Sequence, residues 1–354
     1  MIRTIVMGLC FTCLASGPAS TGPKSKIPVS GLIQALQDPL PAVRQKAATQ
    51  LANMGPAAKD AVPALIVAIQ DQDMWVRLNA ADALGRIGPA AKPAVPALSQ
   101  ALSDSQYQVR LYAASALEHL GPDAKAAVPA LTEALKDVDP QVRGNAAWAL
   151  ERIGPASNGA IPDLVKMLSD PERWPRGSAA RALGALGRAA LAAEEPLLKA
   201  AEGDRDSWVR ARAMWALGRI GAKPQSTVPV LIKGLTDAGK LARAKAAEAL
   251  ASFGADAKDA VPALIKVLSD PDGLVRRHAA IALGNIGPDA RKAVPALVKG
   301  LGDAAAWQRR ECATALGKIG PSAVAAVPRL KQLLNDKDPD VKKQAAEALR
   351  LIQK

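Results

Sequence analysis

The chain has 354 residues, of which 49% are hydrophobic and only 3% aromatic, and its formal net charge is +13. The high apolar share excludes an intrinsically disordered chain, and the abundance of alanine and leucine favours helices over strands. A basic balance is typical of proteins with acidic partners, such as acidic proteins, nucleic acids or anionic surfaces, unless the charge is spread evenly over a solvated surface.

Residues 1–20 predict a secretory signal peptide. Arg3 is the only early charge, an apolar run follows from Ile5 to Ala15, and small residues occupy positions 16–20. The run is too short to cross a bilayer as a helix, and cleavage is expected within residues 15–22. Residues 21–27 are then a linker, and the mature chain is exported to the periplasm or the extracellular space. The alternative is an ordinary N-terminal tail.

Cleavage would remove Cys10 and Cys13 and leave Cys312 as the only cysteine, so no intramolecular disulfide could form. Cys312 occupies a position that holds alanine in other repeats, for example Ala279. We therefore expect a buried, small apolar side chain rather than a nucleophile.

From residue 28 to residue 354 the sequence repeats about ten times with a period of 33 residues. A proline opens an apolar run in nearly every copy, at Pro63, Pro96, Pro129, Pro162, Pro196, Pro229, Pro262, Pro295 and Pro328. Every step between these prolines is 33 residues except one of 34, and Pro28 begins a slightly offset first copy. An internal period of this length indicates a stack of similar units rather than a single globular core.

Each unit predicts two helices, called A and B. Helix A begins at the proline, which the first turn of a helix tolerates. Its apolar face is formed by Val62, Leu65, Ile66 and Ile69. An aspartate-containing turn follows, and helix B then carries Val76, Ala80, Ala81, Leu84 and Ile87 at helical spacing. Gly88 and Pro89 end helix B, because glycine permits a left-handed cap and proline cannot continue the helix.

A single helix pair cannot bury both of its apolar faces, whereas stacked pairs can. The recurring Val-Pro-Ala-Leu, Val-Arg, Ala-Leu-Gly and Ile-Gly-Pro segments resemble HEAT repeats, in particular the short bacterial type found in phycobilisome lyase subunits. The resemblance implies an all-α, armadillo-type α-solenoid, a right-handed superhelix with helix B on its concave side. It is specific for fold and weak for function.

Every A–B turn holds an aspartate, followed six residues later by a basic residue. The aspartates are Asp38, Asp71, Asp104, Asp137, Asp170, Asp204, Asp237, Asp270, Asp303 and Asp336. The basic residues are Arg44, Arg77, Arg110, Arg143, Arg176, Arg210, Arg243, Arg276, Arg309 and Lys342. A row of arginines could bind a polyanion, but each has an aspartate at fixed spacing, in a turn whose free N–H groups need acceptors. HEAT repeats join neighbours through such a ladder, so we assign these residues to structure.

The repeats differ most along one face of helix B. Positions two before, and two, five and nine after, the ladder arginine are spaced by four, three and four residues, so they share a face. We call this set the stripe. It contains all six tryptophans, both histidines and Tyr112. Since the consensus apolar positions hold almost no aromatics, the stripe is where we expect a binding surface.

Three consecutive units in the centre contribute the richest part of the stripe, which we call the central patch. Its residues are Trp148, Arg152, Trp174, Arg181, Trp208, Arg212, Trp215 and Arg219. Tryptophan and arginine are enriched at binding hot spots, and arginine pairs with carboxylates, so the patch predicts an acidic peptide or protein partner. The alternative is that tryptophans fill gaps between helices, which fits Trp75, Trp174, Trp208 and Trp307 better than Trp148 and Trp215.

The fifth unit departs most from the consensus. Pro175 replaces a valine there, and we expect the one-residue insertion within residues 188–195, with a local change in the superhelix.

Catalytic and cofactor motifs are not recognisable in the sequence. His119 and His278 lie five repeats apart, too far to share a metal ion, and there is no phosphate-binding loop or nucleophile–histidine set. We therefore expect a monomeric, non-catalytic binding scaffold without cofactor or metal. The alternatives are a lyase or chaperone-like subunit resembling phycobilin lyases, or a nucleic-acid-binding HEAT protein. The predicted export argues against both, and membrane binding is not expected.

Overall fold

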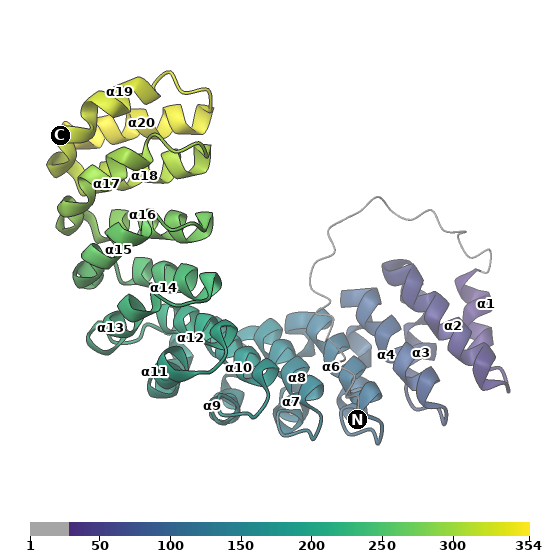
Figure 1. Cartoon of the computed structure of the whole chain (residues 1–354). Helices are drawn as coiled ribbons and strands as arrows, with labels where there is room; N and C mark the ends of the chain where they lie inside the picture. The colour runs from purple at the N-terminus through teal and green to yellow at the C-terminus, as the bar shows by residue number, and fades with distance from the viewer. Residues whose placement is uncertain (1–27) are drawn as a thin grey trace, which may run out of the picture.

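The computed structural model describes residues 28–354, so the predicted signal peptide and linker at residues 1–27 lie outside the described residues. The described chain is an α-solenoid in which helical hairpins stack side by side, as predicted. Figure 1 shows that the stack bends around α11–α13 into two arms. The second helix of each hairpin lies on the inner side of the bend and the first helix on the outer side.

The A helices are short, most of them seven residues long. They are α1 Val29–Ala35, α3 Val62–Ala68, α5 Val95–Ala101, α7 Val128–Ala134, α9 Ile161–Met167, α11 Glu194–Gly203, α13 Pro224–Gly234, α15 Val261–Val267, α17 Val294–Gly300 and α19 Val327–Leu333.

The B helices all have 14 residues. They are α2 Pro41–Met54, α4 Met74–Ile87, α6 Tyr107–Leu120, α8 Pro140–Ile153, α10 Arg173–Leu186, α12 Ser207–Ile220, α14 Lys240–Phe253, α16 Gly273–Ile286, α18 Ala306–Ile319 and α20 Pro339–Ile352.

A 3-10 helix that the sequence did not predict joins most B helices to the next A helix. These segments are η1 Gly55–Ala61, η2 Gly88–Ala94, η3 Gly121–Ala127, η4 Gly154–Ala160, η5 Gly187–Ala193, η6 Gly254–Ala260, η7 Gly287–Ala293 and η8 Gly320–Ala326. The Gly-Pro pair therefore ends the α-helix but starts a tighter one, in which a proline in the first turn costs no hydrogen bond.

The capping glycine is also more specialised than a left-handed cap. Gly88 has φ 75° and ψ −141°, a combination essentially restricted to glycine, and seven of the other capping glycines share this region. Gly221 alone among them is left-handed, with φ 72° and ψ 41°. Its unit has no 3-10 segment, and α13 begins instead at Pro224.

The one-residue insertion lies in α11 and not in residues 188–195, so that expectation was wrong. Seven residues separate the buried Leu197 from Asp204, where six separate Leu164 from Asp170. The extra residue lets α11 continue to Gly203, whereas the usual A helix ends in a two-residue turn. Both irregular connections, at α11 and at Gly221, fall where the stack bends.

Neighbouring B helices approach so closely that their backbones touch. A Cβ atom placed on Gly85 would lie 2.9 Å from the Cα atom of Ala116 in the next unit, and Gly284 stands in the same relation to Ala315. Small residues at the crossing allow this approach, while leucines such as Leu84, which is fully buried, fill the layer between A and B helices. The close contact of B helices keeps them on the inside of the curve.

The ladder joins neighbouring repeats, which confirms its structural role. In eight of the nine arginine–aspartate steps, Nε and Nη2 donate to both carboxylate oxygens of the aspartate in the next repeat, at 2.5–3.0 Å. Nη1 donates instead to main-chain carbonyls of its own turn; in Arg176 the acceptors are Asp170 and Pro171. Each ladder aspartate also accepts the N–H two residues further along, as Asp71 does from Asp73.

One step of the ladder is weak. Arg276 reaches Asp303 only through Nη2, at 3.7 Å, and its buried Nε has no hydrogen-bond partner. Its guanidinium lies instead 5.9 Å from the ring centroid of Trp307. The joint between α16 and α18 therefore lacks the two short bonds that hold the other joints.

Candidate functional site

The stripe lies on the inner side of the bend, and its four positions differ in exposure. The position nine residues after the ladder arginine is exposed in all eight units that the stripe covers. Its occupants are Arg86, His119, Arg152, Ala185, Arg219, Ser252, Asn285 and Lys318. The two middle positions are half-buried in most units. A partner would therefore meet first the edge of the concave face where the B helices end.

Three tryptophans of the central patch form a row across α8, α10 and α12. The ring centroids of Trp148 and Trp174 are 4.7 Å apart with their planes tilted by 60°. Trp174 and Trp208 are stacked, 5.7 Å apart with planes within 8°. All three are half-buried. Contacts of this kind add about 0.5–1.5 kcal/mol each beyond the burial of area, so the row also stabilises the stack.

Glycines in the preceding B helix make room for these indoles. A Cβ atom on Gly144 would overlap the ring of Trp174, and one on Gly177 would overlap the ring of Trp208. Trp215 packs in the same way on Gly184, where an added Cβ would lie 2.6 Å from its ring. The interpretation of tryptophans as gap fillers thus holds for Trp174 and Trp208, and it extends to Trp215.

The sequence analysis missed this glycine–tryptophan pairing. Glycine directly follows the ladder arginine only at Gly144 and Gly177, and in both cases the next unit carries a tryptophan two residues before its own arginine. Comparing neighbouring repeats, instead of aligning each with a consensus, would have found the signal. Trp307 beside Gly273 is a looser example, and Trp75, without a glycine partner, is 49% exposed.

Two arginines of the central patch already have partners within the protein. Arg181 forms an ion pair of 2.8 Å with Glu151 and lies 5.3 Å from the ring centroid of Trp148. Arg212 lies 5.3 Å from the ring centroid of Trp208. Both arginine side chains are half-buried against the indole rings. They therefore support the tryptophan row and also add positive charge to the surface.

The other two arginines of the central patch, Arg152 and Arg219, are exposed at the ends of α8 and α12 and form no ion pair in the described chain, although the charge of Arg152 acts on the Glu118 carboxyl. Arg219 only approaches Trp215, 5.9 Å from its ring centroid. Arg188, which follows α10 where most units have proline, is likewise exposed and without a carboxylate. Three neighbouring B helices therefore end in a cation available to a ligand.

Two half-buried titratable groups lie on inner helices outside the central patch. Burial raises the pKa of Glu118, at the end of α6, although the positive charges of His119, Arg152 and Arg181 oppose the shift. Burial also lowers the pKa of His278, on α16, against the attraction of Glu248. Glu118 therefore holds a partly desolvated carboxyl group on the N-terminal side of the central patch.

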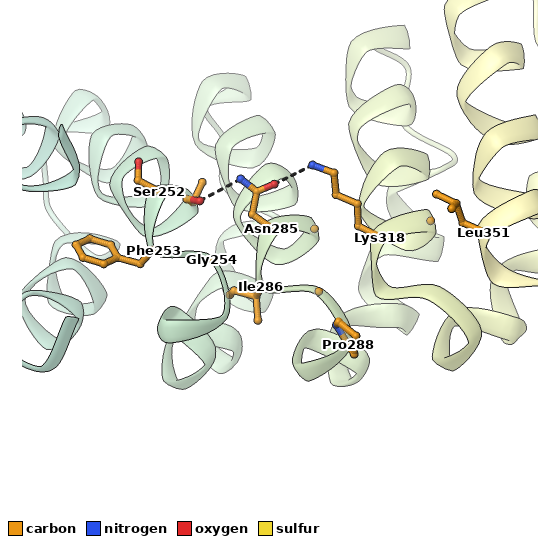
Figure 2. A pocket seen from close by; sticks show the side chains of 12 residues that line it. Ser252, Phe253, Gly254, Asn285, Ile286, Pro288, Lys318 and Leu351 are labelled. Carbon is orange, nitrogen blue, oxygen red and sulfur yellow. Dashed lines mark hydrogen bonds between the residues drawn. The ribbon is translucent and has the colours of Figure 1, made fainter. Parts of the chain in front are cut away.

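An open groove of about 720 Å³ continues the exposed edge beyond Arg219, into the C-terminal arm (Figure 2). Ser252, Asn285 and Lys318 line it from three consecutive B helices and lie in a row in Figure 2. Asn285 donates from Nδ2 to the carbonyl of Ala251 at 3.0 Å, and its Oδ1 accepts from Lys318 Nζ at 2.9 Å. Below this row lie apolar groups, including Phe253 and Ile286.

Residues 28–354 hold neither a cluster of metal ligands nor a membrane-spanning helix. That part of the chain contains no group of three or more histidine, cysteine or acidic residues arranged to hold a metal ion. In the same residues, every helix falls short of the length and apolarity needed to span a bilayer. Cys312 is buried as predicted, and burial raises the pKa of its thiol to about 12.

Comparisons with known proteins agree with this architecture. The crystal structure of an engineered protein is 28% identical in sequence and aligns with a TM-score of 0.62 over 92% of this chain and 99% of its own. In all, 470 chains of known structure match, so the fold is common and does not by itself indicate a function. The search of curated proteins finds no match, and the resemblance to phycobilisome lyases in particular is not confirmed.

The family model for HEAT repeats matches at residues 29–100, 95–184, 161–251, 228–311 and 294–354. These matches overlap and together cover the stack from its first hairpin to its last. The chain belongs to the HEAT-repeat family.

Proposed function

We propose that this protein is a non-catalytic scaffold that binds an acidic segment of another protein on the inner side of its bend. HEAT-repeat solenoids commonly serve protein interaction, and that coarser role fits the stack of ten hairpins described above. The finer proposal concerns the exposed edge at the ends of α8, α10 and α12.

The observation that carries the proposal is the contrast between two sets of arginines. Most ladder arginines are held by the carboxylate of the next repeat and have little charge to offer a ligand. Arg152, Arg188 and Arg219 have no such carboxylate and lie in solvent. Unpaired arginines on one concave edge attract carboxylates, which they bind through two parallel hydrogen bonds.

The tryptophan row has a supporting part in this proposal. Because Trp148, Trp174 and Trp208 are packed on each other and on glycines, they form a rigid apolar ledge beside the arginines. A rigid surface loses little conformational entropy when a partner binds. The arginines then determine which partner is chosen, and the indoles supply flat contact area.

Charge-matched variants test the proposal. One variant replaces Arg152, Arg188 and Arg219 with glutamine. The control replaces Lys266, Lys299 and Lys331, exposed cations of A helices on the outer side, with glutamine. Fluorescence anisotropy with a labelled ten-residue glutamate peptide should show about tenfold or more weaker binding for the first variant only. Equal weakening in both variants would mean that net charge alone attracts the peptide, and unchanged binding in the first would refute the site.

The same two variants identify natural partners and competing functions. Proteins captured from the exported fraction by the wild type and by the control, but not by the arginine variant, are candidates for the partner. Duplex DNA of equal charge is titrated in parallel, because tighter and strongly salt-dependent DNA binding would favour nucleic-acid recognition instead. We also propose that the protein is exported after removal of residues 1–20. Sequencing of the N-terminus of the mature protein tests this.

A further inference from the structure

The groove in the C-terminal arm has a chemistry of its own. Its lining residues come from α14, α16, α18 and α20 and from the turns that follow them, so it crosses several repeats. None of them is acidic, and Lys318 is the only charged one. Asp256 and Asp289, in the adjoining 3-10 helices, do not line it.

Two glycines line the groove at the helix crossings, where each lies against an alanine of the next B helix. Gly284 and Gly317 line it where the corresponding positions in α6 and α8 hold Glu118 and Glu151. All of its lining residues lie in the C-terminal arm, from α14 to α20. The Cβ position of Gly218 lies 3.4 Å from Ser252 Oγ, so Arg219, the next residue, stands at the near end of the groove.

Positive charge lies at two places along the groove. Arg219 stands just outside its end at α14, and Lys318 lines it on α18, with only Leu351 of α20 farther along. Neither cation forms an ion pair in the described chain. Between them, helices α14 and α16 end, and the carbonyls at a helix C-terminus carry a partial negative charge. That charge disfavours acidic side chains in the middle, where Ser252 and Asn285 offer hydrogen bonds instead.

The distance between the two cations sets the length of a ligand that reaches both. Arg219 and Lys318 are three repeats apart. At roughly 8–10 Å between packed helices, this corresponds to about 27 Å. An extended chain advances about 3.3 Å per residue, so roughly eight residues cover the distance.

We propose that the groove binds an extended protein segment with an acidic residue at each end and about eight uncharged residues between them. The inference rests on the proposed function and gives the direction of the partner, which runs from the central patch toward the C-terminus.

Two labelled peptides of equal composition test this proposal. The first has aspartate pairs at both ends of an uncharged stretch of about eight residues; the second has the same four aspartates in its centre. Anisotropy should show about fivefold or tighter binding of the first peptide. Ser252→Trp, which places a large side chain in the groove, and Lys318→Gln should each abolish that preference. Lys299→Gln, on the outer side, should leave it intact.

The outcomes separate this inference from the proposed function. Equal affinity for the two peptides, or a preference that survives both groove variants, overturns the groove proposal. If the arginine variant at the bend still loses the glutamate peptide, the proposed function stands without the groove. If neither set of variants changes any binding, both proposals fail. Thermal melting by circular dichroism must show that each variant keeps the stability of the wild type, and Asn285→Ser provides a second, milder change at the groove.

Discussion

The arginine ladder gives a quantitative prediction, because one of its steps is an internal control. Arg176 makes two short bonds with Asp204, of 2.6 and 2.9 Å, and both side chains are only 7% exposed. Arg276 has the same main-chain bonds to its own turn but only the 3.7 Å contact with Asp303. The same substitution at the two sites therefore differs mainly in the carboxylate bonds that it removes.

Hydrogen bonds to charged groups contribute about 1.5 kcal/mol or more each, and removing one partner of a buried pair costs about 3–5 kcal/mol. We expect Arg176→Ala to lower the free energy of unfolding by about 3 kcal/mol or more, and Arg276→Ala by about 1 kcal/mol. Double-mutant cycles isolate the carboxylate contribution. The coupling between Arg176→Ala and Asp204→Asn should reach about 2 kcal/mol, and that between Arg276→Ala and Asp303→Asn should stay below about 0.5 kcal/mol.

Urea unfolding followed by circular dichroism measures these differences. Repeat arrays do not always unfold in one step, so hydrogen exchange at α10 and α12 supplies a local measurement. Equal coupling energies at the two sites would refute the reasoning. They would show that the pair of short arginine–carboxylate bonds does not determine how strongly two repeats are joined.

Three further predictions concern single features. Gly177→Ala should lower the melting temperature, because its Cβ overlaps the Trp208 ring, and adding Trp208→Leu should restore part of the loss. Burial raises the pKa of the Cys312 thiol to about 12, so the native protein should resist a thiol reagent. After denaturation, the reagent should detect one thiol per chain if residues 1–20 have been removed and three if they have not. The hydrogen bond from Arg44 lowers the pKa of Asp71, and the bond from Arg309 lowers that of Asp336. Because these pKa values are lower in the folded state, the ladder should stabilise the fold above about pH 4 and lose this contribution on further acidification. Melting temperatures that stay level down to pH 2 would contradict the assignment.

Much of the fold could be predicted because every repeat carries the same spacing of apolar residues. The spacing of Val62, Leu65 and Ile69 determines a helical face in one unit, and nine further copies support the interpretation. The order of A and B helices and the structural role of the ladder follow from such local periodicity.

The contacts between units were harder to predict, because they depend on register rather than on composition. Each ladder arginine lies six residues from one aspartate and 27 or, for Arg176, 28 from another, and only the stacked structure shows that its carboxylate partner is the distant one. Gly88-Pro89 ends an α-helix in sequence terms, and nothing local distinguishes a loop from the 3-10 helix that follows.

The central patch was predicted as a set of residues but not as an arrangement. Its tryptophans lie together across three helices, yet their support by Gly144, Gly177 and Gly184 involves pairs of residues in different repeats. The groove has no sequence motif either, because its lining residues come from four different B helices and the turns between them.

The direction of the ladder has a consequence for the length of the molecule. Each inner repeat presents an arginine to the unit that follows and an aspartate to the unit before it, so eight of the nine joints are made of the same two halves. If a complete 33-residue segment were removed or duplicated, an equivalent arginine would meet an equivalent aspartate. The new neighbours would then be joined by the same ion pair. The curved surface can therefore grow or shrink in whole steps, each adding room for about three residues of an extended partner, without redesign of the units on either side.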